Sequence, residues 1–220
     1  MICNASPSML DTIMMNYQEI EQWLKNYSIE NYTIHDNLVV DVDDDVDLFS
    51  KNLKTLPFQF GKVMGYFNCS YTKIASLQHC PITVGRGFYC DNNQLTSLQY
   101  CPTTAGGGFN CSNNQLTSLR YCPTTVRGFF NCSNNQLTSL QYCPTTVEGG
   151  FNCSHNQLTS LQYCQQSVGG GFYCSDNPFI VTEKNESEWM EIIKNHKNVF
   201  LAIKEPTEAL TSLYKMVWEV

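Results

Sequence analysis

The sequence lacks any segment that would carry the chain into or across a membrane. No apolar run approaches the roughly 20 residues that a membrane-spanning helix needs. The first residues, MICNASPSMLDTIMMNY, have neither the basic start nor the continuous apolar stretch of a secretory signal peptide. We therefore expect a cytoplasmic protein, and thiols in that compartment stay reduced.

Charge is scarce too, and positive charge most of all. The 220 residues carry 13 Lys and Arg against 20 Asp and Glu, which gives a formal net charge of −7. Residues 62–182 hold five basic and three acidic side chains. A chain of this kind is not expected to bind nucleic acid or an anionic membrane through general electrostatics.

Motifs for catalysis and metal binding are also missing. No Gly-Lys-Ser/Thr accompanies the glycine clusters, and no two cysteines have the Cys-x-x-Cys spacing. The histidines at 35, 79, 155 and 196 lie far apart and fall in no motif. The acidic run at residues 41–47 lacks the glycine and closing glutamate of an EF-hand, so we interpret it as a solvated turn and edge strand. We predict that the protein is not an enzyme and holds no cofactor or metal ion.

Cysteine, by contrast, is abundant and periodic. Most of the twelve cysteines fall into two series, each with a spacing of 21 residues. The first series is Cys69, Cys90, Cys111, Cys132, Cys153 and Cys174, and the second is Cys80, Cys101, Cys122, Cys143 and Cys164. A Phe precedes each first-series cysteine by two residues. In the regular coils an Asn follows it by three and two Leu follow by five and eight. The same phase continues backwards through Val46, Leu48, Leu53 and Leu56.

The Phe and Cys of each coil should point inward together, because side chains in a strand alternate with a period of two. A free cysteine then acts as a small buried apolar residue beside the phenylalanine. Disulfides are the alternative, since neighbouring cysteines of a column would lie about 5 Å apart. Their Cα–Cβ vectors are parallel, however, and the coils hold an odd number of cysteines. Zinc is a weaker alternative because the spacing is wrong. We predict reduced packing thiols, with the Asn column satisfying backbone groups in the turns.

Glycine and proline mark the rest of the coil. Clusters such as Gly106, Gly107 and Gly108 stand just before the strand and predict turns and tight backbone. A proline follows the second cysteine of four coils, which argues against a helix on that side. These prolines are Pro81, Pro102, Pro123 and Pro144.

The pattern apolar-x-apolar-x-x-Asn-x-Leu-x-x-Leu resembles the leucine-rich repeat. In that family each coil adds a short strand to a parallel sheet and then returns through a turn. The resemblance implies an α/β repeat protein, a leucine-rich-repeat solenoid with a short-strand parallel sheet. Seven 21-residue repeats would occupy residues 42–182, between an N-terminal helical and hairpin cap at 1–41 and a C-terminal helical cap at 183–220.

Both ends have patterns of their own. Residues 8–27 place apolar side chains at helical spacing, and residues 32–42 predict two short strands around Asp36 and Asn37. At the far end, Asn185 with Glu188 indicates a helix start, and Pro206 is placed to open a last helix.

Departures from the repeat on the outward positions mark a candidate binding surface. Exposed aromatic and arginine side chains commonly anchor protein interfaces, and a solenoid's sheet face is an extended platform. The candidate residues are Tyr66, Arg86, Tyr89, Asp91, Arg127, Phe129, Glu148, His155 and Tyr173. They predict a non-enzymatic scaffold that binds a protein partner.

A narrower resemblance concerns YTIHDNLVVDVDDDVDL, LKTLPFQFGKV and the FNCSNNQLTSL series. Over about residues 20–180 these stretches resemble small leucine-rich-repeat proteins encoded by tailed bacteriophages. That resemblance implies a viral protein in the host cytoplasm that binds and inhibits a bacterial host or defence protein.

Two other functions stay open. The apolar residues of the terminal helices are compatible with a structural protein that forms homo-oligomers through its end caps. An ordered Thr/Ser surface that binds ice or glycan is the other possibility. It is motivated by the in-register Thr96, Thr117, Thr138 and Thr159.

Overall fold

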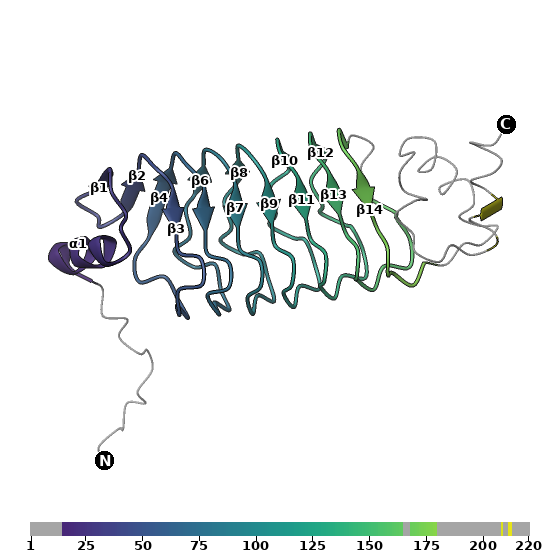
Figure 1. The fold of residues 1–220 in the computed structure, drawn as a ribbon, viewed down its shortest axis with the longest axis horizontal. Helices are drawn as coiled ribbons and strands as arrows, with labels where there is room; N and C mark the ends of the chain where they lie inside the picture. The colour runs from purple at the N-terminus through teal and green to yellow at the C-terminus, as the bar shows by residue number, and fades with distance from the viewer. Residues whose placement is uncertain (1–14, 165–167, 180–207, 209–210, 213–220) are drawn as a thin grey trace, which may run out of the picture.

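The Phe-x-Cys segments form one of two parallel sheets, here called sheet B. The computed structural model describes residues 15–164, 168–179, 208 and 211–212, and its coils stack in one row (Figure 1). Each strand pairs with its equivalent one coil on, from Val46 opposite Phe67 to Phe151 opposite Phe172. The strands of sheet B are β3 (Val46–Asp47), β5 (Phe67–Asn68), β7 (Phe88–Tyr89), β9 (Phe109–Asn110), β11 (Phe130–Asn131), β13 (Phe151–Asn152) and β14 (Phe172–Tyr173). The repeat phase that the sequence predicts back to Val46 is confirmed.

A second parallel sheet, sheet A, lies on the return side of each coil, where the sequence predicts no strand. From β6 to β12 its strands are the Thr-Val or Thr-Ala pair that begins two residues after each proline, and β-branched residues suit such strands. After the hairpin described below, they are β4 (Phe60–Val63), β6 (Thr83–Val84), β8 (Thr104–Ala105), β10 (Thr125–Val126) and β12 (Thr146–Val147). The chain is therefore a parallel β-solenoid with a 21-residue turn. As the prolines predict, none of the described coil residues is helical.

One helix precedes the coils (Figure 1). α1 (Tyr17–Asn26) begins at a capping box, in which the Asn16 side chain accepts a hydrogen bond from the Glu19 amide at 3.0 Å. The Glu19 carboxylate in turn accepts one from the Asn16 amide at 2.8 Å. These bonds satisfy amides that a helix start leaves unpaired, and they fix the first helical residue at Tyr17. Residues 15 and 16 belong to the helix predicted over 8–27 but are not helical, so the prediction extends too far at the N-terminal end. Residues 8–14 lie outside the described part.

A hairpin connects α1 to the first coil. β1 (Tyr32–Ile34) and β2 (Val40–Val42) pair antiparallel, which confirms the two strands predicted around Asp36 and Asn37. β2 then pairs in parallel with β4, so the hairpin extends sheet A.

The helices predicted after the repeats are covered only in part. The one expected from Asn185 lies outside the described residues. Of the one expected after Pro206, residues 208 and 211–212 are described, and all three are helical.

Phenylalanine rings form the centre of the core. Each ring contacts its equivalent in the next coil, with centroids 5.2 to 5.9 Å apart, and is at most 2% exposed. The column is Phe67, Phe88, Phe109, Phe130, Phe151 and Phe172. First-series cysteines and both leucine columns are buried beside it. The predicted inward direction of Phe and Cys is confirmed.

Asparagine side chains link successive coils in the turns. The amide of Asn135 donates to the carbonyls of Cys111 in the preceding coil and of Cys132 and Ser133 in its own, at 3.1 to 3.2 Å. Its carbonyl oxygen accepts from the Leu116 amide at 2.9 Å. Asn114, Asn156 and Asn177 repeat the arrangement. The predicted role of this column is confirmed.

Glycine is required by close approach rather than by an unusual φ. No described glycine has a positive φ. A Cβ on Gly106 would instead collide with the carbonyl oxygen of Gly85 in the preceding coil. The tight backbone predicted from the glycine clusters is therefore present, and contact between coils is its cause.

Phe130 and Asn131 allow a direct test of the inward and outward assignment. Phe130→Ala removes a fully buried ring that contacts the phenylalanine rings of both neighbouring coils, and we expect it to cost about 3–5 kcal/mol. Asn131→Ala removes an outward side chain whose oxygen accepts a hydrogen bond from the Ser133 amide, and it should cost about 1 kcal/mol or less. Urea denaturation followed by circular dichroism measures both. A larger loss for Asn131→Ala would refute the assignment.

Alanine substitution of two glycines distinguishes steric crowding between coils from the loss of glycine's conformational freedom. Gly106→Ala should cost about 1–3 kcal/mol, because the added methyl overlaps backbone that cannot move alone. Gly150→Ala is the matched control, since its Cβ would meet nothing closer than the Gly171 oxygen at 3.2 Å. Urea midpoints of the two variants should differ clearly, and equal midpoints would contradict the crowding argument.

Candidate binding surface

Three of the sequence-predicted residues come together on the outer face of sheet B. The rings of Tyr66 and Tyr89 have centroids 6.2 Å apart, and Tyr89 stacks on Phe129 at 6.2 Å with 15° between the ring planes. We call these three residues the aromatic stripe. Tyr89 and Phe129 belong to coils two steps apart, so the stripe crosses the intervening coil. It presents a continuous apolar surface, with Phe129 42% exposed.

Glycine makes room for these rings. A Cβ on Gly87 would collide with the ring of Tyr89, and one on Gly108 would lie 2.6 Å from the ring of Phe129. The rings therefore lie flat over bare backbone, which restricts their rotamers before any partner arrives. A large side chain that is already ordered loses little entropy on binding.

Arg86 extends the stripe with positive charge. Its guanidinium lies 4.0 Å from the carboxylate of Asp45 and is 74% exposed, so the pair is loose and solvated. The same carboxylate accepts a hydrogen bond from the Tyr66 amide at 2.8 Å. Arg86 is thus available to a partner beside the N-terminal end of the stripe.

Asp91, by contrast, is occupied within the protein. Its carboxylate accepts hydrogen bonds from the Ser70 hydroxyl at 2.6 Å, the Asn110 amide at 2.9 Å and the Asn92 amide at 2.7 Å. These donors come from the preceding coil, the next coil and its own coil. The sequence cannot reveal this, since it marks Asp91 only as a departure from serine. The geometry gives it a role in joining coils.

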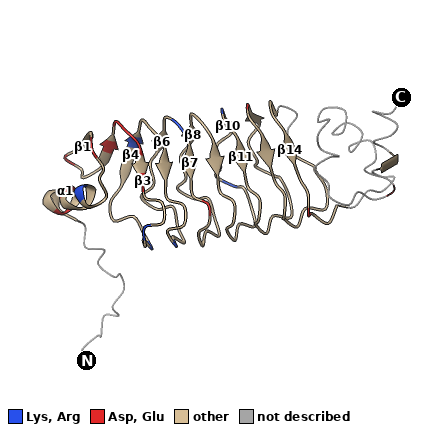
Figure 2. Cartoon of the chain, viewed as in Figure 1, with Lys and Arg blue, Asp and Glu red and all other residues tan. Residues whose placement is uncertain are grey.

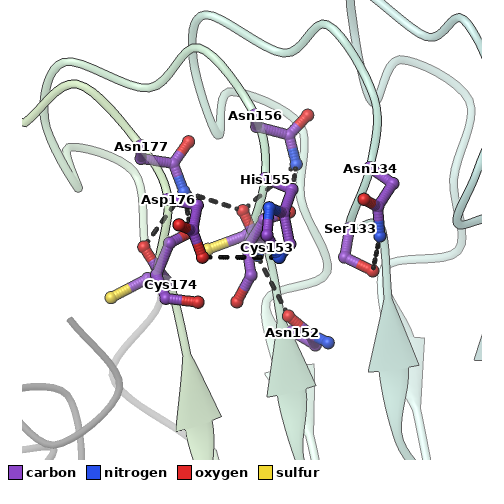
Figure 3. Close-up of polar contacts among 11 residues, drawn as sticks. Ser133, Asn134, Asn152, Cys153, His155, Asn156, Cys174, Asp176 and Asn177 are labelled. Atoms are coloured by element: carbon purple, nitrogen blue, oxygen red, sulfur yellow. Dashed lines mark hydrogen bonds and ion pairs between the residues drawn. The ribbon is translucent and has the colours of Figure 1, made fainter. Parts of the chain in front are cut away.

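The remaining predicted residues do not join the stripe. His155 lies in the turn after β13, where its ring is 3.3 Å from the carboxylate of Asp176 in the next coil (Figure 3). Arg127 and Glu148 are exposed at the bend that leads into sheet B. Tyr173 is 53% exposed and lies against Gly171, two coils beyond Phe129. The nine predicted residues therefore divide into a compact N-terminal group and scattered C-terminal ones.

The acidic run lies at the N-terminal end of the solenoid (Figure 2). β3 is the outermost strand of sheet B there. The Asp44 carboxylate accepts a hydrogen bond from the Asp45 amide at 2.8 Å, and that of Asp47 accepts one from the Phe49 amide at 3.0 Å. Side chains thus occupy amides along an edge that would otherwise attract a further strand. The predicted turn and edge strand are confirmed.

The coil thiols are reduced and shielded from water. None of the eleven described cysteines is in a disulfide, and nine of them are buried. Burial raises the pKa of the Cys101 thiol to about 12 and raises the pKa values of Cys90 and Cys111 well above the ordinary value. A protonated buried thiol is a poor nucleophile and a poor metal ligand.

In the described part of the chain, no group of three or more His, Cys, Asp or Glu could hold a metal ion. No helix in those residues is long and apolar enough to cross a membrane.

A second surface was missed by the sequence analysis. Exposed tyrosines at 21-residue spacing stand where the chain turns toward sheet A, and exposed threonines line that sheet's outer face. The tyrosines are Tyr100, Tyr121, Tyr142 and Tyr163. Their 21-residue spacing is visible in the sequence. The candidate binding residues were, however, the departures from the repeat, and this column contains none. The threonines that the sequence did single out, beginning with Thr96, are exposed in a different part of each coil.

The raised thiol pKa values predict a loss of stability at alkaline pH. Thiols of the unfolded chain ionise near pH 9.0, whereas Cys101 stays protonated in the fold up to about pH 12. As the pH rises, the unfolded state therefore releases its thiol protons first. The stability that the buried thiols contribute is complete below about pH 9 and decreases above it. Urea midpoints at about pH 7, 9 and 10.5 should fall in that order.

Cys132→Ala is the control for other alkaline groups, because it removes one buried thiol and should reduce the pH dependence. Native labelling with Ellman's reagent at neutral pH gives a second readout. Prompt reaction of most coil thiols would contradict their burial.

Comparison with known proteins gives no further guide to this surface. A scan against protein-family models, a search of curated proteins and a search of solved structures found no match.

Proposed function

We propose that the chain is a non-enzymatic scaffold that binds a protein partner through the outer face of sheet B. The observation that supports this proposal is the aromatic stripe, in which Tyr89 contacts Tyr66 on one side and Phe129 on the other, so that the three rings span four coils. Arg86 lies beside it with its guanidinium exposed. Aromatic and arginine side chains are the residues most enriched at the centres of protein interfaces.

The irregularity of this face favours a protein over a repetitive ligand. Between β5 and β14 the other positions of the same columns are glycine and asparagine, apart from Tyr173, so the stripe is a local feature on a nearly uniform background. An aperiodic surface is matched by an aperiodic partner. The rigid coils and the glycine beneath the rings keep the stripe in one conformation, which lowers the entropic cost of association.

The finer classification belongs to the same proposal. The repeat pattern supports a solenoid of the leucine-rich-repeat type, closed by an N-terminal cap formed by α1 and the hairpin. Its resemblance to phage-encoded proteins directs the search for a partner to bacterial proteins, including defence proteins. Binding would then act by covering a functional surface of that host protein in the bacterial cytoplasm.

Capture from bacterial lysate tests the proposal. The wild-type chain should retain a stoichiometric protein, and Tyr89→Ala combined with Phe129→Ala should weaken its binding by about tenfold or more. Asn152→Ala on the same face, outside the stripe, is the matched control and should bind normally. Isothermal titration with the purified partner gives the affinities, and thermal melts confirm that the variants fold.

Two results would contradict the proposal. One is the absence of any stoichiometric partner in lysates of several bacterial species. The other is a partner whose affinity is unchanged by the double substitution.

A further inference from the structure

The outer face of sheet A carries two rows of threonine. In one row, Thr83 stands opposite Thr104, and Thr125 stands opposite Thr146, with β8 and β10 in the same register. The second row is formed by Thr103, Thr124 and Thr145, all exposed. Each row thus presents equivalent hydroxyls at the coil spacing of about 4.8 Å. The hydroxyls of Thr103 and Thr145 donate to the carbonyls of Ile82 at 3.3 Å and of Thr124 at 3.0 Å in the preceding coil, so they meet a ligand as hydrogen-bond acceptors.

A column of exposed tyrosines, which we call the tyrosine ladder, borders these rows. Its members are Tyr100, Tyr121, Tyr142 and Tyr163, and they are 49 to 56% exposed. The first three each stand three residues before a threonine of the second row. They have φ values of 69 to 77°, a conformation that is uncommon for a bulky residue.

Second-series thiols hold this backbone in place. Cys101 donates to the Tyr121 carbonyl at 2.9 Å, and Cys122 donates to that of Tyr142 at 2.9 Å. The rings are therefore fixed outward, at equal intervals, along one edge of the threonine rows.

A hollow of about 500 Å³ lies at the N-terminal end of the rows. Lys62 stands opposite Thr83 in the neighbouring strand, so the hollow and the first threonine row are continuous. The polar side chains in its wall are His35, Asp36, Asn37, Asp41, Lys62 and Thr83, with Val39 and Ile82 as apolar surface. His35 lies 3.0 Å from the Asp41 carboxylate, which also accepts the Lys62 amide at 2.7 Å.

We propose that this face binds an uncharged, extended polysaccharide that runs along the solenoid axis, with its terminal sugars in the hollow. The threonines and tyrosines themselves are uncharged, which matches a neutral polymer better than nucleic acid or an acidic glycan. One ring of the ladder is partly covered, because the Arg120 guanidinium lies over Tyr121, 5.0 Å from the ring centroid. Exposed aromatic rings stack on sugar faces. First-row threonine hydroxyls bond sugar hydroxyls, and the second-row oxygens of Thr103 and Thr145 accept hydrogen bonds from them. A neutral sugar polymer needs both kinds of contact.

Periodicity selects the shape of this ligand. Every coil offers the same groups at the same interval, so a polymer of identical units can repeat one set of contacts along the face. A straight, ribbon-like β-linked chain advances by about one coil step per sugar, whereas a helical α-linked chain turns away from a straight row. The aromatic stripe on sheet B has no part in this site, so the two proposals stand independently.

Affinity electrophoresis in gels containing hydroxyethyl cellulose tests the proposal, with dextran as the α-linked comparison. We expect the full chain to be retarded by hydroxyethyl cellulose and not by dextran. Tyr100→Asn combined with Tyr142→Asn should weaken retardation about tenfold or more, since two stacking rings are lost. Asparagine is well tolerated at positive φ, so the fold should be kept.

Thr125→Lys is a second variant that places a charge and a long side chain in the row. It should reduce binding without unfolding the sheet, because Lys62 already occupies the equivalent position in β4. The control is Tyr89→Ala with Phe129→Ala, which should leave retardation unchanged. Protein capture through sheet B should in turn be unaffected by Thr125→Lys.

Three outcomes would overturn the proposal. Retardation by neither polysaccharide would refute binding, and unchanged retardation in the tyrosine and threonine variants would refute the location. Shaping of growing ice crystals without retardation would assign the rows to a water lattice instead.

Discussion

The register between coils is the constraint on which the rest of the structure depends. Residues 21 positions apart lie opposite one another in sheet B, as Phe130 does with Phe151. Backbone hydrogen bonds hold this register, because the amides of Phe130 and Cys132 donate to the carbonyls of Gly150 and Asn152 in the next coil. Each inward side chain therefore rests on its own counterpart in the next coil. A column must then contain residues of nearly equal volume, and this explains why phenylalanine, leucine and cysteine recur at fixed places. Polar groups in the turns must also be satisfied at the same place in each coil, which asparagine does from Asn93 onward and Thr72 does in the coil before it.

Cysteine fits this constraint for two reasons, of which the sequence reveals only one. The volume argument, a small apolar side chain beside phenylalanine, follows from the pattern alone. The structure adds that thiols donate along the axis, as Cys111 does to the Asn131 carbonyl at 3.5 Å and Cys101 to that of Tyr121. Alanine would fill similar space and leave those carbonyls with one partner fewer. The thiols therefore contribute to both packing and cohesion between coils.

The parts of the fold that could be predicted are those with a long repeat or a strong local signal. The repeat phase back to Val46, the asparagine ladder and the hairpin around Asp36 were all predicted correctly. Sheet A was missed for two reasons. Two-residue strands such as Thr104–Ala105 are too short to show alternation, and the preceding proline indicates a turn. The stacking of Tyr89 on Phe129 was also beyond reach, since it depends on a ring crossing a whole coil. The hydrogen bonds of Asp91 were beyond reach for a related reason, because its three donors come from three coils.

The two faces show how a solenoid separates its surface from its core. An outward side chain contacts little beyond its neighbours in adjacent coils, so it can differ from its column without disturbing the packing inside. Departures from the repeat are therefore informative about an aperiodic partner, and the aromatic stripe was found in this way. A binding site for a periodic ligand contains no such departures, because the repeat itself supplies its contacts. An unbroken column such as Tyr100 to Tyr163 cannot be explained by core packing, since its rings point away from the core. Uniformity on the outside of a solenoid thus requires a reason of its own, and a ligand that repeats with the coils supplies one.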